Sequence, residues 1–436
     1  MTDLVRDVVA LFLLFGALAL PWDVGHDASD RWWVVIATVI SALSLIAPYL
    51  VSMEVVPGFA APQSRLVKYA CAVPYLISVF AALVNELAHL TSEEGGVGVA
   101  VAVGLVGALL AMQARVVDEE PSGVGDGYWR TATLVLIGVG LVAVTITLFI
   151  FTVTNLDDVG SSFAGYNPKV LLIGYSLGLL AAVVVTIGVP FVGFLSGTRE
   201  WARVLAVVGF VMIGSDFLGG ASDSADSLFA SVTLEFFKVV IGLFLVAAGI
   251  ALLVSRPVQR RLASLDAIGT WVATARHACV AGAAALLAIA VARLLLLIGE
   301  SGVHASSVIQ LVLTVLAAGA LLLVQVLLGG NPDHARRIVV AVAGGVILVG
   351  IVAIAVGRGD DAAQTSRSIT FADSAGFFGL PALVLWAMLV PEAIRTSFQP
   401  IAPHPAQQGG QVPPPPPQGY TPPPPPQGYT PPPPQP

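Results

Sequence analysis

The chain has 436 residues, of which 56% are hydrophobic and only 11% are charged, and its net charge is −7. A soluble globular protein needs far more charge on its surface, so this composition excludes a soluble fold and indicates an integral membrane protein. The lipid bilayer is therefore the expected partner, and no nucleic-acid partner is expected.

Apolar runs close to the twenty or so residues that cross a bilayer recur along the whole chain. Each should be helical, because backbone polar groups in hydrocarbon must bond within their own segment. We predict an all-α protein with twelve transmembrane helices, centred near Phe12, Ile40, Val79, Leu105, Leu141, Leu180, Phe210, Ile241, Leu286, Ala317, Leu348 and Leu383. The connections are short, so we expect no inserted catalytic domain.

The first run also resembles a signal peptide, with Ala17-Leu18-Ala19 as a cleavage pattern. Its first residues carry two acidic side chains, Asp3 and Asp7, and one basic side chain, Arg6. A signal peptide begins with a positively charged region, so this run is favoured as a membrane helix that is not cleaved.

Basic residues segregate to one side of the membrane under the twelve-helix count. The side that carries most of them includes Arg6, Arg65, Lys68, Arg115, Arg130, Arg199, Arg203, Arg256, Arg260, Arg261, Arg276, Arg336, Arg337 and Arg395. By the positive-inside rule, this pattern predicts a multi-pass protein of the cell membrane with both termini in the cytoplasm.

Polar residues at the ends of the runs recur in the same order at an offset of about 200 residues. Asp3 and Arg6 correspond to Glu200 and Arg203, and the segment 68–71 corresponds to 276–279, each ending in one of the two cysteines. We therefore predict two six-helix membrane repeats, residues 1–197 and 198–398. Because six is even, the repeats should be parallel and related by a pseudo-twofold axis along the membrane normal.

Prolines inside the predicted helices mark sites of kinks or breaks. Pro74, Pro190 and Pro381 occupy such positions. Pro190 lies between two glycines, so the segment 188–193 is the best candidate for a discontinuous helix.

Ionisable residues inside membrane helices are costly and usually have a partner or a function. Glu86 and Arg293 occupy nearly equivalent positions in the two repeats and could pair across the pseudo-axis. The alternative is that Arg293 extends to the headgroups and Glu86 lies in the interface. Glu235 and Lys238 lie three residues apart on one helical face, and Asp216 could join them. The alternative for this set is a self-neutralising buried pair.

The amino-acid composition changes at residues 399–436. A nine-residue sequence, five prolines followed by Gln-Gly-Tyr-Thr, occurs twice in this segment. Proline runs favour the extended polyproline II helix, so we predict a disordered cytoplasmic tail. Tyr420 and Tyr429 are regularly spaced candidates for binding a cytoplasmic partner. A tail that only confers solubility is the alternative.

No phosphate-binding loop, metal-binding cluster or nucleophile triad is recognisable, so we expect no enzyme activity, no metal and no cofactor. Asp157-Asp158 and Asp360-Asp361 could hold a metal, as in a lipid-linked sugar transferase, but they lie in short acidic loops where a solvated turn is favoured.

The Ala, Val, Leu and Gly-rich runs and the Pro-Pro-Pro-Pro-Gln-Gly-Tyr tail resemble a family of uncharacterised polytopic membrane proteins of actinobacteria. The six-plus-six layout is similar in topology to the major facilitator superfamily. However, the segment 52–65 lacks that superfamily's Gly-x-x-x-Asp-Arg signature.

We therefore expect a secondary transporter or permease-like protein, with its route between the repeats. The candidate site residues are Glu235, Lys238, Glu86, Arg293 and Asp216. The alternative is a non-catalytic membrane scaffold that recruits cytoplasmic partners through the proline-rich tail.

Overall fold

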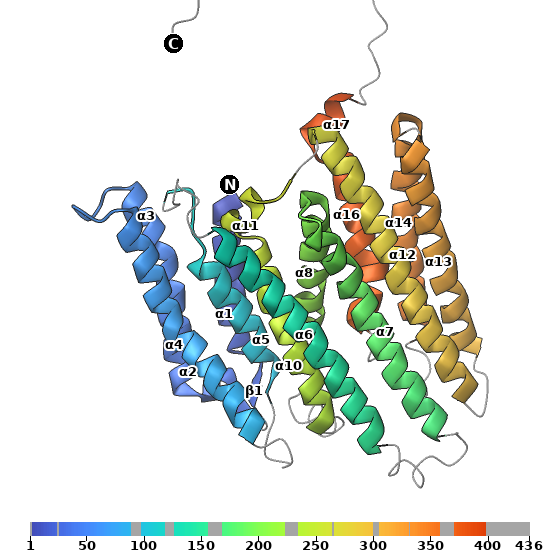
Figure 1. The fold of residues 1–436 in the computed structure, drawn as a ribbon, viewed down its shortest axis with the longest axis horizontal. Coiled ribbons are helices and arrows are strands. Elements are labelled where there is room, and N and C mark those ends of the chain that lie inside the picture. Colours follow the sequence, from blue (N-terminus) through green and yellow to red (C-terminus); the bar gives the residue numbers. More distant parts are fainter. Residues whose placement is uncertain are drawn as a thin grey trace, which may run out of the picture. The chain divides into compact units, whose positions relative to one another are not determined.

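In the computed structural model, the residues that the structure describes are almost entirely helical (Figure 1). The structure describes residues 2–23, 26–88, 97–117, 126–155, 168–222, 234–263, 266–299, 305–330, 332–357 and 370–397. The predicted tail, residues 399–436, lies outside these ranges, as do Tyr420 and Tyr429.

The first predicted repeat corresponds to the elements up to residue 195. They are α1 (Thr2–Ala17), β1 (Pro21–Asp23), β2 (His26–Asp27), the 3-10 helix η1 (Ala28–Asp30), α2 (Trp32–Leu43), the 3-10 helix η2 (Ser44–Ile46), α3 (Ala47–Ser52), α4 (Ala61–Ala88), α5 (Val99–Met112), α6 (Asp126–Asn155) and α7 (Pro168–Leu195). The short antiparallel pair β1–β2 is a small departure from the all-α prediction. Its Asp23 accepts hydrogen bonds from Arg31, which fixes the hairpin to the start of α2.

The second predicted repeat corresponds to the elements from residue 199. They are α8 (Arg199–Ser222), α10 (Leu234–Leu253), α11 (Arg256–Arg260), α12 (Ala267–Gly299), α13 (Ala305–Gly330), α14 (Pro332–Gly357), α15 (Thr370–Ser374), the π-helix η5 (Ala375–Gly379), α16 (Leu380–Leu389) and α17 (Glu392–Ser397). All twelve predicted centres therefore fall within helical segments.

Seven helices in the described ranges are long and apolar enough to cross a membrane. They are Trp32–Ser52, Ala61–Asn85, Asp126–Ile146, Ala267–Leu295, Ala305–Gly330, Ala335–Val356 and Phe371–Leu389. Three shorter apolar helices are Val99–Met112, Leu180–Leu195 and Gly242–Leu253. The chain is thus a helical membrane protein.

Two helices form the most deeply buried parts of the core. Every residue of α5 from Ala100 to Ala111 is buried, between α1, α4 and α10. In the second half, α12 packs against α7, α8, α13 and α16. Glycines let these helices approach closely: a methyl group added at Gly178 of α7 would lie 3.0 Å from the Cα of Ala292 in α12.

Packing differs between the two predicted repeats. In the first, α1 packs mainly against α5. In the second, α8 packs mainly against α7, α10 and α12, whereas the α5 counterpart α13 packs against α12 and α14. Corresponding helices thus have different main neighbours, and the two-repeat organisation stays a prediction from the sequence.

The predicted break at Pro190 is wrong, because α7 runs without interruption from Pro168 to Leu195. The irregular helix is instead the last predicted span, where the helix continues but changes to the π form over η5, between α15 and α16. Pro381 lies in the first turn of α16 and has no N–H to donate to the carbonyl of Phe377, so it removes a regular helical bond at this point.

Candidate functional site

Arg293, one of the predicted site residues, lies in α12 roughly 9 Å before the helix ends at Gly299. Its Nη2 donates to both carboxylate oxygens of Asp373 in α15, at 3.1 and 3.2 Å. Its Nη1 donates to Thr314 Oγ1 and, at 3.4 Å, to the carbonyl oxygen of Gln310, both in α13. These four residues are called the Arg293 centre below.

The Arg293 centre connects four helices. Thr314 Oγ1 donates to the carbonyl of Gln310 at 2.7 Å, and Gln310 Nε2 donates to the carbonyl of Ala353 in α14 at 3.0 Å. The side chains of Arg293 and Asp373 are only 10% and 13% exposed. A charge pair this well enclosed within apolar helices is an unusual feature in a membrane protein.

The π-helix η5 begins two residues after Asp373 and is held by close packing on three sides. A methyl group added at Gly376 would lie 2.7 Å from Leu286 of α12, and one at Gly350 of α14 would lie 2.6 Å from Phe377. One added at Gly379 would overlap Val211 of α8. Since π turns within helices often occur at functional sites, the position beside a buried ion pair is notable.

The donors of Arg293 define what this centre can do chemically. A guanidinium stays protonated and presents a planar fork of N–H groups that matches carboxylates and phosphates. Arg293 Nε is buried and has no hydrogen-bond partner among the residues that the structure describes. The centre is therefore an anion-binding arrangement, and the protein's own Asp373 carboxylate is the anion that occupies it.

The other predicted site residues lie on helices, but their side chains are outside the described part of the structure. Glu86 is in the last turn of α4, Asp216 is in α8, and Glu235 and Lys238 are in the first turns of α10. The proposed contacts among Glu235, Lys238 and Asp216 therefore stay predictions.

The hypothesis that Arg293 pairs with Glu86 needs revision. Arg293 is paired with Asp373 of α15, within the second half of the chain. Its helix α12 packs against α7, α8, α13 and α16, whereas α4 packs against α2, α3 and α5. The guanidinium also does not simply extend to the headgroups, since three of its hydrogen bonds go to side chains of α13 and α15.

Sequence reasoning missed Asp373, Gln310 and Thr314. Asp373 carries the only charge in the apolar segment Phe371–Leu389, so it could have been recognised as an intramembrane carboxylate. Gln310 and Thr314 are four residues apart and so lie on one face of α13. The sequence shows this spacing, but it does not show which helix this face contacts.

A second set of charges lies where α1 begins, and includes Asp3, Arg6, Asp7, Lys68, Arg115 and Arg256; we call it the N-terminal charge cluster. Arg115 donates to Asp7 through Nε, at 2.7 Å, and Nη2. Lys68 Nζ and Arg115 Nη1 donate to the carbonyl of Gln113, at 2.5 and 2.6 Å. Arg256, which opens α11, donates to Asp3 at 3.1 Å. The cluster thus joins the start of α1 to α4, α11 and the end of α5.

No group of three or more His, Cys, Asp or Glu side chains that could hold a metal ion occurs within the described ranges. Cys71 and Cys279 are free thiols on α4 and α12. Cys279 is buried in the apolar core, and Cys71 is half-buried.

Comparison with known proteins gives one match. Residues 3–397 match the model of a family described as Domain of unknown function (DUF7937), which covers nearly the whole helical part of the chain. The chain therefore belongs to this family. No curated protein and no solved structure matches it.

Proposed function

We propose that this member of the DUF7937 family is a permease-like membrane protein that moves a small anion past the Arg293 centre. The observation that carries the proposal is the enclosed Arg293–Asp373 ion pair beside the π-helix η5. Single π turns within helices frequently occur at functional sites, and intramembrane charges commonly mark substrate or ion pathways.

The proposed mechanism is an exchange of anions at Arg293. A substrate carboxylate or phosphate would replace Asp373 on the guanidinium, and Thr314 and the Gln310 carbonyl would keep the fork in place. Release of Asp373 would remove the ion pair that joins α15 to α12. Because η5 lacks regular α-helical bonding, it is the point at which this segment would bend.

The membrane organisation that we propose has twelve spans with both termini in the cytoplasm of a cell-membrane protein. The seven long apolar helices, the three shorter ones, α1 and α8 together account for these twelve spans. The segregation of Arg and Lys in the sequence supports the orientation. The two parallel repeats and the likeness to actinobacterial proteins rest on the sequence alone.

A scaffold is the second candidate, and the proline-rich tail of residues 399–436 is the observation that favours it. In that case Arg293 would only hold helices together, and Tyr420 and Tyr429 would bind a cytoplasmic protein. Deleting residues 399–436 would then abolish the protein's cellular role, whereas a permease would keep its flux. Neither proposal includes catalysis.

Water access to the Arg293 centre separates the two candidates. In a background in which Cys71 and Cys279 are replaced by alanine, Thr314→Cys is exposed to membrane-impermeant anionic and cationic thiosulfonates in proteoliposomes. A permease predicts labelling at Thr314→Cys, faster with the anionic reagent and slowed by Arg293→Gln, because the guanidinium attracts anions.

Two positions on the same helix provide controls. Ala305→Cys, at the exposed start of α13, should label rapidly. Leu316→Cys, whose side chain is 62% exposed on the outside of the helices, should face lipid and stay unlabelled. If Thr314→Cys behaves like Leu316→Cys with both reagents, the Arg293 centre is a structural link and the permease proposal fails.

A further inference from the structure

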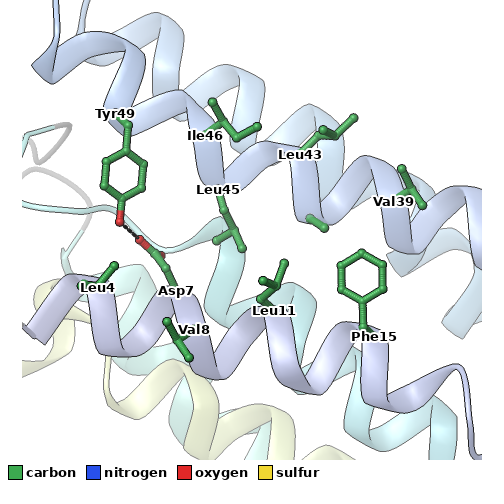
Figure 2. Close-up of a pocket in the computed structure, with 11 residues that line it drawn as sticks. Leu4, Asp7, Val8, Leu11, Phe15, Val39, Leu43, Leu45, Ile46 and Tyr49 are labelled. Carbon is green, nitrogen blue, oxygen red and sulfur yellow. Dashed lines mark hydrogen bonds between the residues drawn. The ribbon is translucent and has the colours of Figure 1, made fainter.

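A groove lies between α1 and the segment α2–η2–α3. Its residues are far in the sequence from those of the Arg293 centre. It has a volume of ≈ 620 Å³. Figure 2 shows the two walls running in opposite directions, with Phe15 opposite Val39 at one end and Asp7 bonded to Tyr49 at the other. The side chains along it are apolar: Val8, Leu11 and Phe15 on α1, and Val39, Leu43 and Ile46 on the other wall.

The groove follows from the sequence on each wall. Leu4, Val8, Leu11 and Phe15 recur every three or four residues and so share one face of α1. The opposite wall changes from α-helix to 3-10 helix at Ser44–Ile46, just before Pro48, which cannot donate a backbone hydrogen bond.

The groove residues are exposed on the outside of the protein, where a membrane helix meets lipid. Leu11 is 42% exposed and Leu43 is 56% exposed. From Leu4 to Phe15 the groove runs for about 16 Å along α1. This length matches one leaflet, which is half of a hydrocarbon core about 30 Å thick. A single extended acyl chain therefore fits its chemistry and its length.

The polar end of the groove provides the second constraint on the occupant. Tyr49 and Asp7 close that end through a 2.8 Å hydrogen bond, and Arg115 binds the same carboxylate. Asp7 and Arg115 belong to the N-terminal charge cluster, where four cations face two carboxylates and leave a net charge of +2. Arg6 is the least engaged of the four, since its contacts are a 3.4 Å bond to the Ala114 carbonyl and a 3.9 Å pairing with Asp3.

We propose that this groove holds one anionic phospholipid of the leaflet on the side of the N-terminus. Its acyl chain lies between α1 and α2–η2–α3, and its phosphate lies at the N-terminal charge cluster. The apolar lining accepts the chain, and the net positive charge selects the headgroup. The bound lipid completes the packing between α1 and α2, so it acts as a structural ligand independent of transport at Arg293.

Native mass spectrometry of the full-length protein, released from nanodiscs of phosphatidylglycerol or of phosphatidylcholine, tests this proposal. The expected result is one retained phosphatidylglycerol per monomer and little retained phosphatidylcholine. Leu11→Trp and Val39→Trp, which fill the groove, should each lower the fraction of monomer with bound lipid about tenfold. Arg6→Gln should reduce the preference for phosphatidylglycerol while leaving phosphatidylcholine retention unchanged.

The matched control is Val142→Trp, at a 57% exposed position of α6 outside the groove, which should retain the lipid like the wild type. Thermal unfolding of each variant in the same nanodiscs identifies any variant that is simply misfolded. Equal lipid retention by Leu11→Trp, Val39→Trp and wild type would refute the site. The proposal would also be refuted if the wild type is a dimer and both groove variants are monomers. The groove would then be occupied by a second copy of this chain.

Discussion

At the residue scale, the Arg293–Asp373 pair illustrates why a buried charge needs its counter-charge. The two side chains are only 10% and 13% exposed, so solvation by water offsets little of the cost when either partner is removed. Thr314 and Gln310 bind the guanidinium but carry no charge, so they cannot replace the carboxylate.

A double-mutant cycle on this pair should therefore be strongly non-additive. Asp373→Leu alone and Arg293→Met alone should each lower the free energy of unfolding by about 3–5 kcal/mol. The double variant Arg293→Met/Asp373→Leu should lose much less, because no uncompensated charge remains. Denaturant unfolding in detergent micelles measures all the variants. Losses that simply add would mean that the two groups do not interact.

Tyr75 of α4 is a second residue whose environment makes a prediction. It is fully buried, and its ring meets Trp22 edge-on at 6.1 Å, but its hydroxyl has no hydrogen-bond partner among the described residues. A buried hydroxyl without a partner costs about 1–3 kcal/mol. Tyr75→Phe should therefore keep or raise the melting temperature.

The same hydroxyl lies against Gly104 of α5, where an added methyl group would overlap it. Gly104→Ala should lower the melting temperature, and Tyr75→Phe should recover part of the loss. Gly319→Ala in α13 is the control, since nothing lies within 4 Å of its added methyl group. Equal effects of the two alanine substitutions would show that α5 is not packed against Tyr75 in this way.

At the element scale, α6 and α10 approach each other closely in the middle of the chain. A methyl group added at Gly140 would lie 2.6 Å from the carbonyl oxygen of Gly242, and one added at Gly242 would lie 2.8 Å from that of Gly140. The two glycines therefore make possible the backbone-to-backbone approach that holds these helices together.

Gly140→Ala should accordingly force α6 and α10 apart and cost about 1–3 kcal/mol, the usual cost of overpacking. Gly138→Ala, two residues earlier on the same helix, is the matched control, because its added methyl group would lie 3.8 Å from Phe191, an ordinary contact. Thermal unfolding of the two purified variants makes the comparison. A smaller loss for Gly140→Ala than for Gly138→Ala would contradict the packing.

Also at the element scale, two prolines of similar sequence context behave differently. Pro190 remains inside the continuous helix α7, whereas Pro381 follows the π-helix η5. Each proline removes one backbone donor and so weakens a helix, but only the helix before Pro381 departs from the α form. The difference depends on neighbours, here the close contacts of Gly376 with α12, of Gly379 with α8 and of Phe377 with Gly350 of α14.

At the scale of the whole molecule, the number of spans determines where the termini lie. Twelve spans put both termini on one side of the membrane, whereas crossing by only the seven long and strongly apolar helices named above would put them on opposite sides. Epitope tags at the two termini should therefore both resist protease in intact cells and both be cleaved after permeabilisation. Cleavage of one tag alone in intact cells would rule out an even number of spans.

The sequence alone determined that this is a helical membrane protein, where its helices are centred, and that Arg293 is a residue of interest. These properties follow from composition and local periodicity, because hydrocarbon forces each apolar segment to satisfy its own backbone. Only the tertiary structure decided that Asp373 and Thr314 bind Arg293, that the irregular helix lies at η5 rather than at Pro190, and that α1 and α2 leave a groove. Those outcomes depend on which helix faces come together, and lipid-exposed and protein-facing surfaces of a membrane helix are equally apolar, so hydrophobic patterning carries little information about the partner.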